Sequence, residues 1–155
     1  MDDMNIIFDL DGVLRDLVGY LVKKYEIPYP QNWFWKYKGK DIFEWAEHDG
    51  LKVLTEAQPT EFFMNFKHKV TEIWTCQSDD WLPHTMLWIE KYLPNRTTMI
   101  LSTEQKEKLL CSKKNTLLVE DSPNFKNYDK IILMDRPYNK HIKCENRIND
   151  EWRKV

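Results

Sequence analysis

Two aspartates near the start of the chain, Asp9 and Asp11, are the residues whose types and spacing best suit chemistry. They follow the apolar run of residues 5–8, which predicts a buried strand that ends at Asp9. Gly12 comes next and lets the backbone turn sharply away. A carboxylate can attack phosphorus and form an aspartyl-phosphate, and a second acid can protonate the leaving oxygen and then activate water. The pair therefore predicts phosphoryl transfer beside a hard cation.

Two later apolar runs also end in polar side chains that suit this chemistry. Ser102 and its neighbour Thr103 follow one run, and Glu120 and Asp121 follow the other. A hydroxyl at a strand end can bind a phosphoryl group, and adjacent carboxylates can hold a cation.

The elements that must position these residues follow from hydrophobic periodicity and from turn residues. Strands are expected at 4–9, 97–102, 115–121 and 130–134, and helices at 16–25, 41–48, 51–57, from 59 onward, at 83–93 and at 149–155. Strands that alternate with helices predict an α/β fold with a parallel sheet, in which ligands bind at the carboxyl ends of the strands. The aromatic, helical region 17–80 is expected to be a small cap inserted after the first strand, and residues 1–16 and 81–155 form the core domain.

The order of these motifs resembles that of the haloacid dehalogenase (HAD) superfamily, whose first motif is similar to Asp9-Leu-Asp-Gly-Val. The resemblance implies a Rossmann-like core and a Mg²⁺-dependent mechanism. Asp9 would be the nucleophile and Asp11 the general acid and base. The metal would be held by Asp9, Asp11 (through its backbone carbonyl), Glu120 and Asp121. Within the last pair Asp121 is expected to be the direct ligand, with Glu120 near it or acting through water. Ser102 would bind the phosphoryl group.

The superfamily also implies a lysine that neutralises phosphate charge. Lys114 is favoured because it directly precedes the third expected strand, and Lys106 and Lys113 are alternatives. The segment 103–119 is shorter than the helix-strand-loop connection usual in the family, which predicts a trimmed core.

A narrower resemblance to the 5′(3′)-deoxyribonucleotidase family covers residues 4–18 and 97–154. It is carried by Leu117-Leu-Val-Glu-Asp-Ser-Pro, by Asp135-Arg-Pro-Tyr-Asn-Lys and by a Phe-Phe segment at 61–66. The resemblance implies a nucleoside monophosphate as substrate, with Thr103 near it. Bases stack on aromatic side chains, and Phe43 and Phe63 are the preferred base contacts. Two alternatives stay open: a phosphatase for another small phosphomonoester or a polynucleotide end, and a catalytically impaired binding or regulatory module.

Composition limits the function classes. The chain has 155 residues, 31% charged and 42% hydrophobic, with a net charge of −2, which gives no reason to expect general nucleic-acid binding. No apolar stretch is long enough for a membrane span. Three widely spaced cysteines indicate neither a disulfide framework nor a zinc site, and the acidic start shows no secretory pattern. We expect a cytoplasmic protein, with the choice between monomer and homodimer open.

Overall fold

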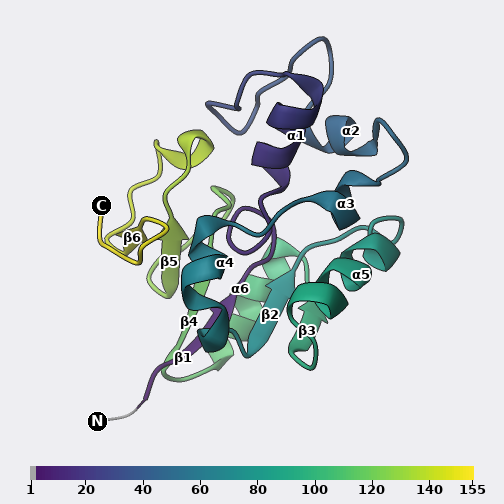
Figure 1. The fold of residues 1–155 in the computed structure, drawn as a ribbon. Coiled ribbons are helices and arrows are strands. Elements are labelled where there is room, and N and C mark those ends of the chain that lie inside the picture. Colours follow the sequence, from purple (N-terminus) through teal and green to yellow (C-terminus); the bar gives the residue numbers. More distant parts are fainter. Residues whose placement is uncertain (1–2) are drawn as a thin grey trace.

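The computed structural model describes residues 3–155, and its centre is a six-stranded sheet in which every neighbouring pair of strands is parallel (Figure 1). The strand order is β3-β2-β1-β4-β5-β6. The strands are β1 (Asn5–Phe8), β2 (Glu72–Thr75), β3 (Thr97–Ile100), β4 (Thr116–Glu120), β5 (Ile131–Met134) and β6 (Arg147–Ile148). The parallel α/β architecture predicted from the sequence is confirmed.

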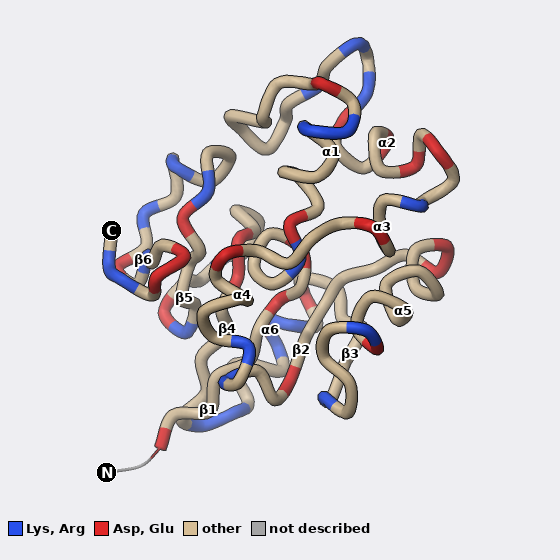
Figure 2. The backbone as a smooth tube through the Cα atoms, viewed as in Figure 1, with Lys and Arg blue, Asp and Glu red and all other residues tan. Residues whose placement is uncertain are grey.

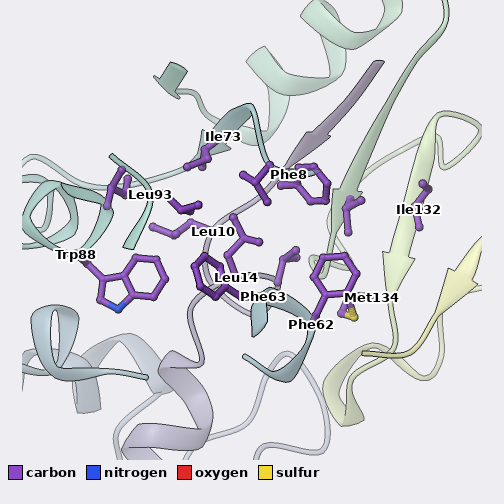
Figure 3. Packing of buried hydrophobic residues seen from close by; sticks show 14 of the residues in the cluster. Phe8, Leu10, Leu14, Phe62, Phe63, Ile73, Trp88, Leu93, Ile132 and Met134 are labelled. Atoms are coloured by element: carbon purple, nitrogen blue, oxygen red, sulfur yellow. The ribbon is translucent and has the colours of Figure 1, made fainter. Parts of the chain in front are cut away.

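Alternate residues of the central strands point to opposite faces of the sheet, and both faces are covered. Phe8 and Val119 lie in one buried cluster with side chains from α4 (Glu61–Phe66) and α5 (Leu82–Tyr92) (Figure 3). Their neighbours Ile7 and Leu118 lie in another cluster, with α6 (Thr103–Ser112). Burial on both faces explains why these strands read as short continuous apolar runs.

Strand β2 corrects the expected boundary of the cap. It lies inside the range 17–80, yet it pairs with both β1 and β3 in the main sheet. The segment 103–119 holds α6 and most of β4. It looked too short for the expected connection because β2, a further strand of the sheet, lies earlier in the chain. The core is therefore not trimmed. The helix expected at 149–155 is also wrong, because those residues form turns and an isolated bridge from Lys154 back to Ile148.

The cap consists of α1 (Leu17–Tyr25), α2 (Ile42–Glu47) and α3 (Val53–Glu56), which lie above the carboxyl ends of the strands (Figure 1). These helices share a buried apolar cluster of their own. The chain leaves the core at Asp16, the N-cap of α1, and returns at Gln58, whose carbonyl accepts a 2.8 Å hydrogen bond from the Asp16 amide. The two linkers of the cap therefore run side by side.

Helix α4, with the short helical turn Lys67–Lys69 after it, belongs to the core layer rather than to the cap. A second short turn covers Pro137–Asn139. Basic and acidic residues are intermingled along the backbone in both cap and core (Figure 2). Between residues 3 and 155, no helix combines the length and the apolar character needed to cross a membrane.

Candidate active site

Three buried carboxylates meet at the carboxyl ends of the two central strands. Asp9 follows β1, Glu120 is the last residue of β4, and Asp121 comes directly after it. The pairing of Phe8 with Val119 brings the two strand ends level, and the Asp9 amide donates to the Val119 carbonyl at 2.9 Å. One oxygen of each acid lies within 4.8 Å of the others. The structure therefore brings together the three acids that the sequence singled out at separate strand ends.

Lys106 supplies a positive charge to this cluster. Its Nζ donates to Asp9 Oδ1 at 3.0 Å and to Glu120 Oε2 at 2.8 Å, and its residue is only 3% exposed. The preference for Lys114 is corrected by this geometry: Lys114 is exposed and precedes β4, at the end of the sheet opposite the acids. Lys113 is the C-cap residue of α6. Because Lys106 lies in the first turns of α6, helix formation aims its side chain at the carboxyl edge of the sheet.

Burial and repulsion shape the charge state of the cluster. Burial, followed by the charge of Glu120, raises the pKa of Asp9 well above its usual value and that of Asp121 to about 7. Burial is the largest single influence on Glu120 and raises its pKa, but the Lys106 charge and the hydrogen bonds with Asp9, Lys106 and Asp121 together outweigh burial and leave the pKa of Glu120 below its usual value. The two carboxylates raise the pKa of Lys106 despite its burial. Three acids thus share one cation, and the cluster is short of positive charge.

This donor set fits a divalent cation. Hard cations prefer carboxylate oxygens, and a second positive charge would offset the repulsion among the three acids. Glu120 is already engaged, since Oε2 accepts from Lys106 and Oε1 accepts from the amides of Asp121 and Ser122. Asp9 and Asp121 therefore have more free acceptor capacity for a cation than Glu120, and the expected ranking of Asp121 over Glu120 stays a prediction.

The Asp11 side chain lies outside that cluster and is held by other partners. Its Oδ1 accepts from Arg15 Nε at 2.6 Å, and its Oδ2 accepts from Arg15 Nη2 and Gln77 Nε2, both at 2.9 Å. Asp11 also lines the main cavity of the protein. This position suits a role in proton transfer. A contribution of Asp11 to metal binding would come from its backbone, as the sequence resemblance implied.

Thr75 occupies the place that the sequence reasoning gave to Ser102. It ends β2, the strand beside β1, and it is 1% exposed and lines the cavity. Ser102 is exposed and caps α6, where its Oγ accepts from the Gln105 amide at 3.2 Å. Thr103 does line the cavity, as expected for a residue near the substrate. The β-rich run at 70–75 was the signal that could have found Thr75.

Tyr138 and Gly12 fit tightly around Asp121. The Tyr138 hydroxyl donates to Asp121 Oδ2, and burial, then the Asp121 charge, raises the pKa of Tyr138. A Cβ on Gly12 would lie 1.9 Å from Asp121 Oδ2 and 2.6 Å from the Tyr138 oxygen. Gly12 also has a φ of 81°. The turn after Asp11 therefore needs glycine for space as well as for conformation.

A cavity of about 660 Å³ opens above the acids and is roofed by aromatic side chains from the cap and from the start of α5. The aromatic residues that line it are Trp33, Phe34, Trp35, Phe43, Trp81 and Tyr138. Phe43 is thus placed as the sequence reasoning expected. Phe63 is not: it is 2% exposed and packs against Trp88 and Tyr92 in the core (Figure 3). Its expected role as a base contact is corrected.

Comparisons of the chain with models of known protein families and with curated proteins find no match. The geometry of the site and the sequence resemblance are therefore the grounds for a function.

Proposed function

We propose that this protein is a Mg²⁺-dependent phosphatase of the HAD type that hydrolyses phosphomonoesters through an aspartyl-phosphate on Asp9. The observation that carries the proposal is the meeting of Asp9, Lys106 and Asp121 at the floor of a large cavity. A nucleophilic carboxylate, a buried cation and a site for a divalent metal are the parts that phosphoryl transfer needs.

The residues divide the reaction between them. Asp9 attacks phosphorus, and the bond from phosphorus to the leaving oxygen breaks while Asp11 gives that oxygen its proton. Water then attacks the phosphorus of the aspartyl-phosphate, Asp11 takes the proton, and Asp9 is released with inorganic phosphate. Lys106 and the Thr75 hydroxyl stabilise the charge on the transferring group. Mg²⁺, held by Asp9 and Asp121, would supply further charge neutralisation.

The favoured substrate is a nucleoside monophosphate, with a deoxyribose or ribose sugar. The cavity has the size of a small-molecule site, and its acidic, metal-binding floor lies opposite an aromatic roof. A phosphate at the floor and a base against Trp33 or Phe43 would use both ends of the cavity.

The test is phosphate release from a panel of nucleoside monophosphates and sugar phosphates, with Mg²⁺ and with a chelator. We expect turnover of nucleotides that requires Mg²⁺ and disappears in Asp9→Asn. Asp129→Asn, at an exposed aspartate in the loop before β5, is the matched control and should keep full activity. Turnover of sugar phosphates alone would contradict the proposed substrate class, and absence of turnover on every ester would contradict the mechanism.

A further inference from the structure

Arg15 is a completely buried arginine that lies beside the reacting groups. Its side chain is 0% exposed, and its guanidinium donates hydrogen bonds to both carboxylate oxygens of Asp11, from Nε and from Nη2. Nη2 also contacts Thr85 Oγ1 at 3.1 Å, and the group lies 5.8 Å from the centre of the Trp88 ring. Burying a guanidinium is costly unless it is paired, and Asp11 is its ion-pair partner among the described residues.

The contacts leave Asp11 little freedom. A carboxylate has about four acceptor sites, two on each oxygen. Arg15 occupies one on Oδ1 and one on Oδ2, and Gln77 occupies the second on Oδ2. One acceptor site, on Oδ1, remains without a partner among the described residues, in an acid that lines the cavity. The fork of Arg15 thus fixes the plane of the carboxylate and the direction of this remaining acceptor site.

Arg15 also joins this carboxylate to the base of the cap. Its Nη1 donates to the Leu54 carbonyl of α3 at 2.9 Å, and its backbone forms a bridge with Pro59 in the returning linker. Asp16, the next residue, bonds to the Gln58 carbonyl in the same linker. One side chain therefore contacts the acid and base of the proposed reaction, a cap helix and the core helix α5.

We infer that Arg15 is a positioning residue for proton transfer. It orients Asp11 through the bidentate contact, and it links that orientation to the position of the cap through its hydrogen bond to Leu54. The inference rests on the proposed function, in which Asp11 protonates the leaving oxygen. Arg15 does not touch the reacting atoms, so its effect on the first step, the transfer of the phosphoryl group to Asp9, must depend on how much the leaving group needs a proton.

The experiment compares two esters in Mg²⁺: thymidine 5′-monophosphate, whose alkoxide leaving group needs a proton, and p-nitrophenyl phosphate, whose phenolate does not. We expect Arg15→Met to lower kcat/KM, which reports the steps up to phosphoryl transfer, on the nucleotide by at least about tenfold more than on the aryl ester. In an Asp11→Asn background, Arg15→Met should cause no further loss on either ester. Arg96→Met, which removes an arginine that bonds to the Val70 and Pro94 carbonyls at the far end of the sheet, should leave both rates unchanged.

Folding is controlled separately, because removing a buried cation can unfold the chain. Arg15→Lys keeps the charge but loses the fork, and it should fold while keeping the altered ratio of the two rates. Amide exchange at Asp16 and Thr60, which bond across the cap linkers, should rise in both Arg15 variants and not in Arg96→Met. Equal losses on the two esters, or an unchanged ratio in both variants, overturn the role of Arg15 alone. Absence of turnover by the unmodified chain overturns the proposed function and this role with it.

Discussion

Lys106 carries the charge balance of the candidate site. It is the cation that contacts both Asp9 and Glu120, and all three groups are buried. A lysine in such a place contributes to catalysis and to stability together, because its loss leaves two carboxylates close to each other without their shared partner.

Lys106→Met is expected to lower kcat by about a hundredfold or more and to reduce the free energy of unfolding by about 3–5 kcal/mol. Phosphate release and urea unfolding measure the two effects. Lys114→Met, at an exposed position on the other edge of the sheet, is the matched control and should change neither quantity. A larger loss in Lys114→Met than in Lys106→Met would restore the original assignment.

The raised pKa of Asp121 predicts how pH affects the metal-free protein. The folded chain holds this proton up to about pH 7, whereas the unfolded chain releases it near the ordinary value of 3.8. Between these values the folded state binds more protons, so the contribution of Asp121 to stability falls as pH rises, by at most about 1.4 kcal/mol per pH unit.

We therefore expect the free energy of unfolding of the unmodified chain, relative to Asp121→Asn, to decline from about pH 4 to about pH 7 in the presence of a chelator. Urea unfolding of both proteins across this range measures the difference. A difference that is flat, or that grows with pH, would show that Asp121 is ionised throughout in the folded protein.

At the level of elements, β2 decides which of the two hydroxyl residues lines the cavity. Thr75 ends the strand next to β1, whereas Ser102 follows β3 at the edge of the sheet. Thr75→Val keeps the shape of the side chain, so we expect a loss of about a hundredfold in kcat with little loss of stability. Ser102→Ala should cost about 0.5–2 kcal/mol through the lost helix cap and leave kcat unchanged. Steady-state kinetics with thermal unfolding separates them, and the reverse pattern would refute the placement.

The turn after β1 allows a similarly matched comparison. Gly12 and Gly50 both have positive φ, but a Cβ on Gly50 meets nothing within 4 Å. Gly50→Ala should therefore cost only the conformational strain, about 1–2 kcal/mol. Gly12→Ala should cost about 1–3 kcal/mol more, because the new methyl collides with Asp121 and Tyr138. Denaturant unfolding measures both, and equal costs would contradict the tight packing at Gly12.

The elements also show what the sequence could and could not predict. Strands with a continuous apolar centre that leads into acids, such as β1 and β4, were visible because burial on both faces leaves such a run. β2 was hidden because it is short and follows a helical, aromatic stretch, so its residues were assigned to the cap. Once β2 was missed, Ser102 took the role of Thr75, and the segment before β4 looked too short.

Long-range contacts explain the remaining differences. Nothing local distinguishes Lys106 from Lys108 in the same helix or from Lys113 and Lys114 after it, since the partners of Lys106 are Asp9, distant in sequence, and Glu120. In the same way, the sequence gives no sign that Arg15 is buried, because the partners that enclose it, Leu54 and Thr85, are far away in the chain. Nothing in the sequence separated Phe43 from Phe63 as candidate base contacts. Only the packing shows that Phe43 lines the cavity and that Phe63 lies in the core.

For the whole molecule, the arrangement of cap and core brings the aromatic roof over the acidic floor. The cap closes one end of the cavity, while the sheet edge presents Asp9, Lys106, Glu120 and Asp121 at the other. Residues from both parts would therefore contact one substrate, and Arg15 connects them. All of these roles depend on a single chemical event, the transfer of the phosphoryl group to Asp9.

The most direct test of that event is to quench the reaction with acid during turnover of a nucleoside monophosphate whose phosphoryl group is radiolabelled. In the presence of Mg²⁺, we expect a covalent label on the peptide that contains Asp9, which hydroxylamine removes and which Asp9→Asn lacks. Phosphate release that persists in Asp9→Asn, or turnover in which the label is carried by another residue, would contradict the account.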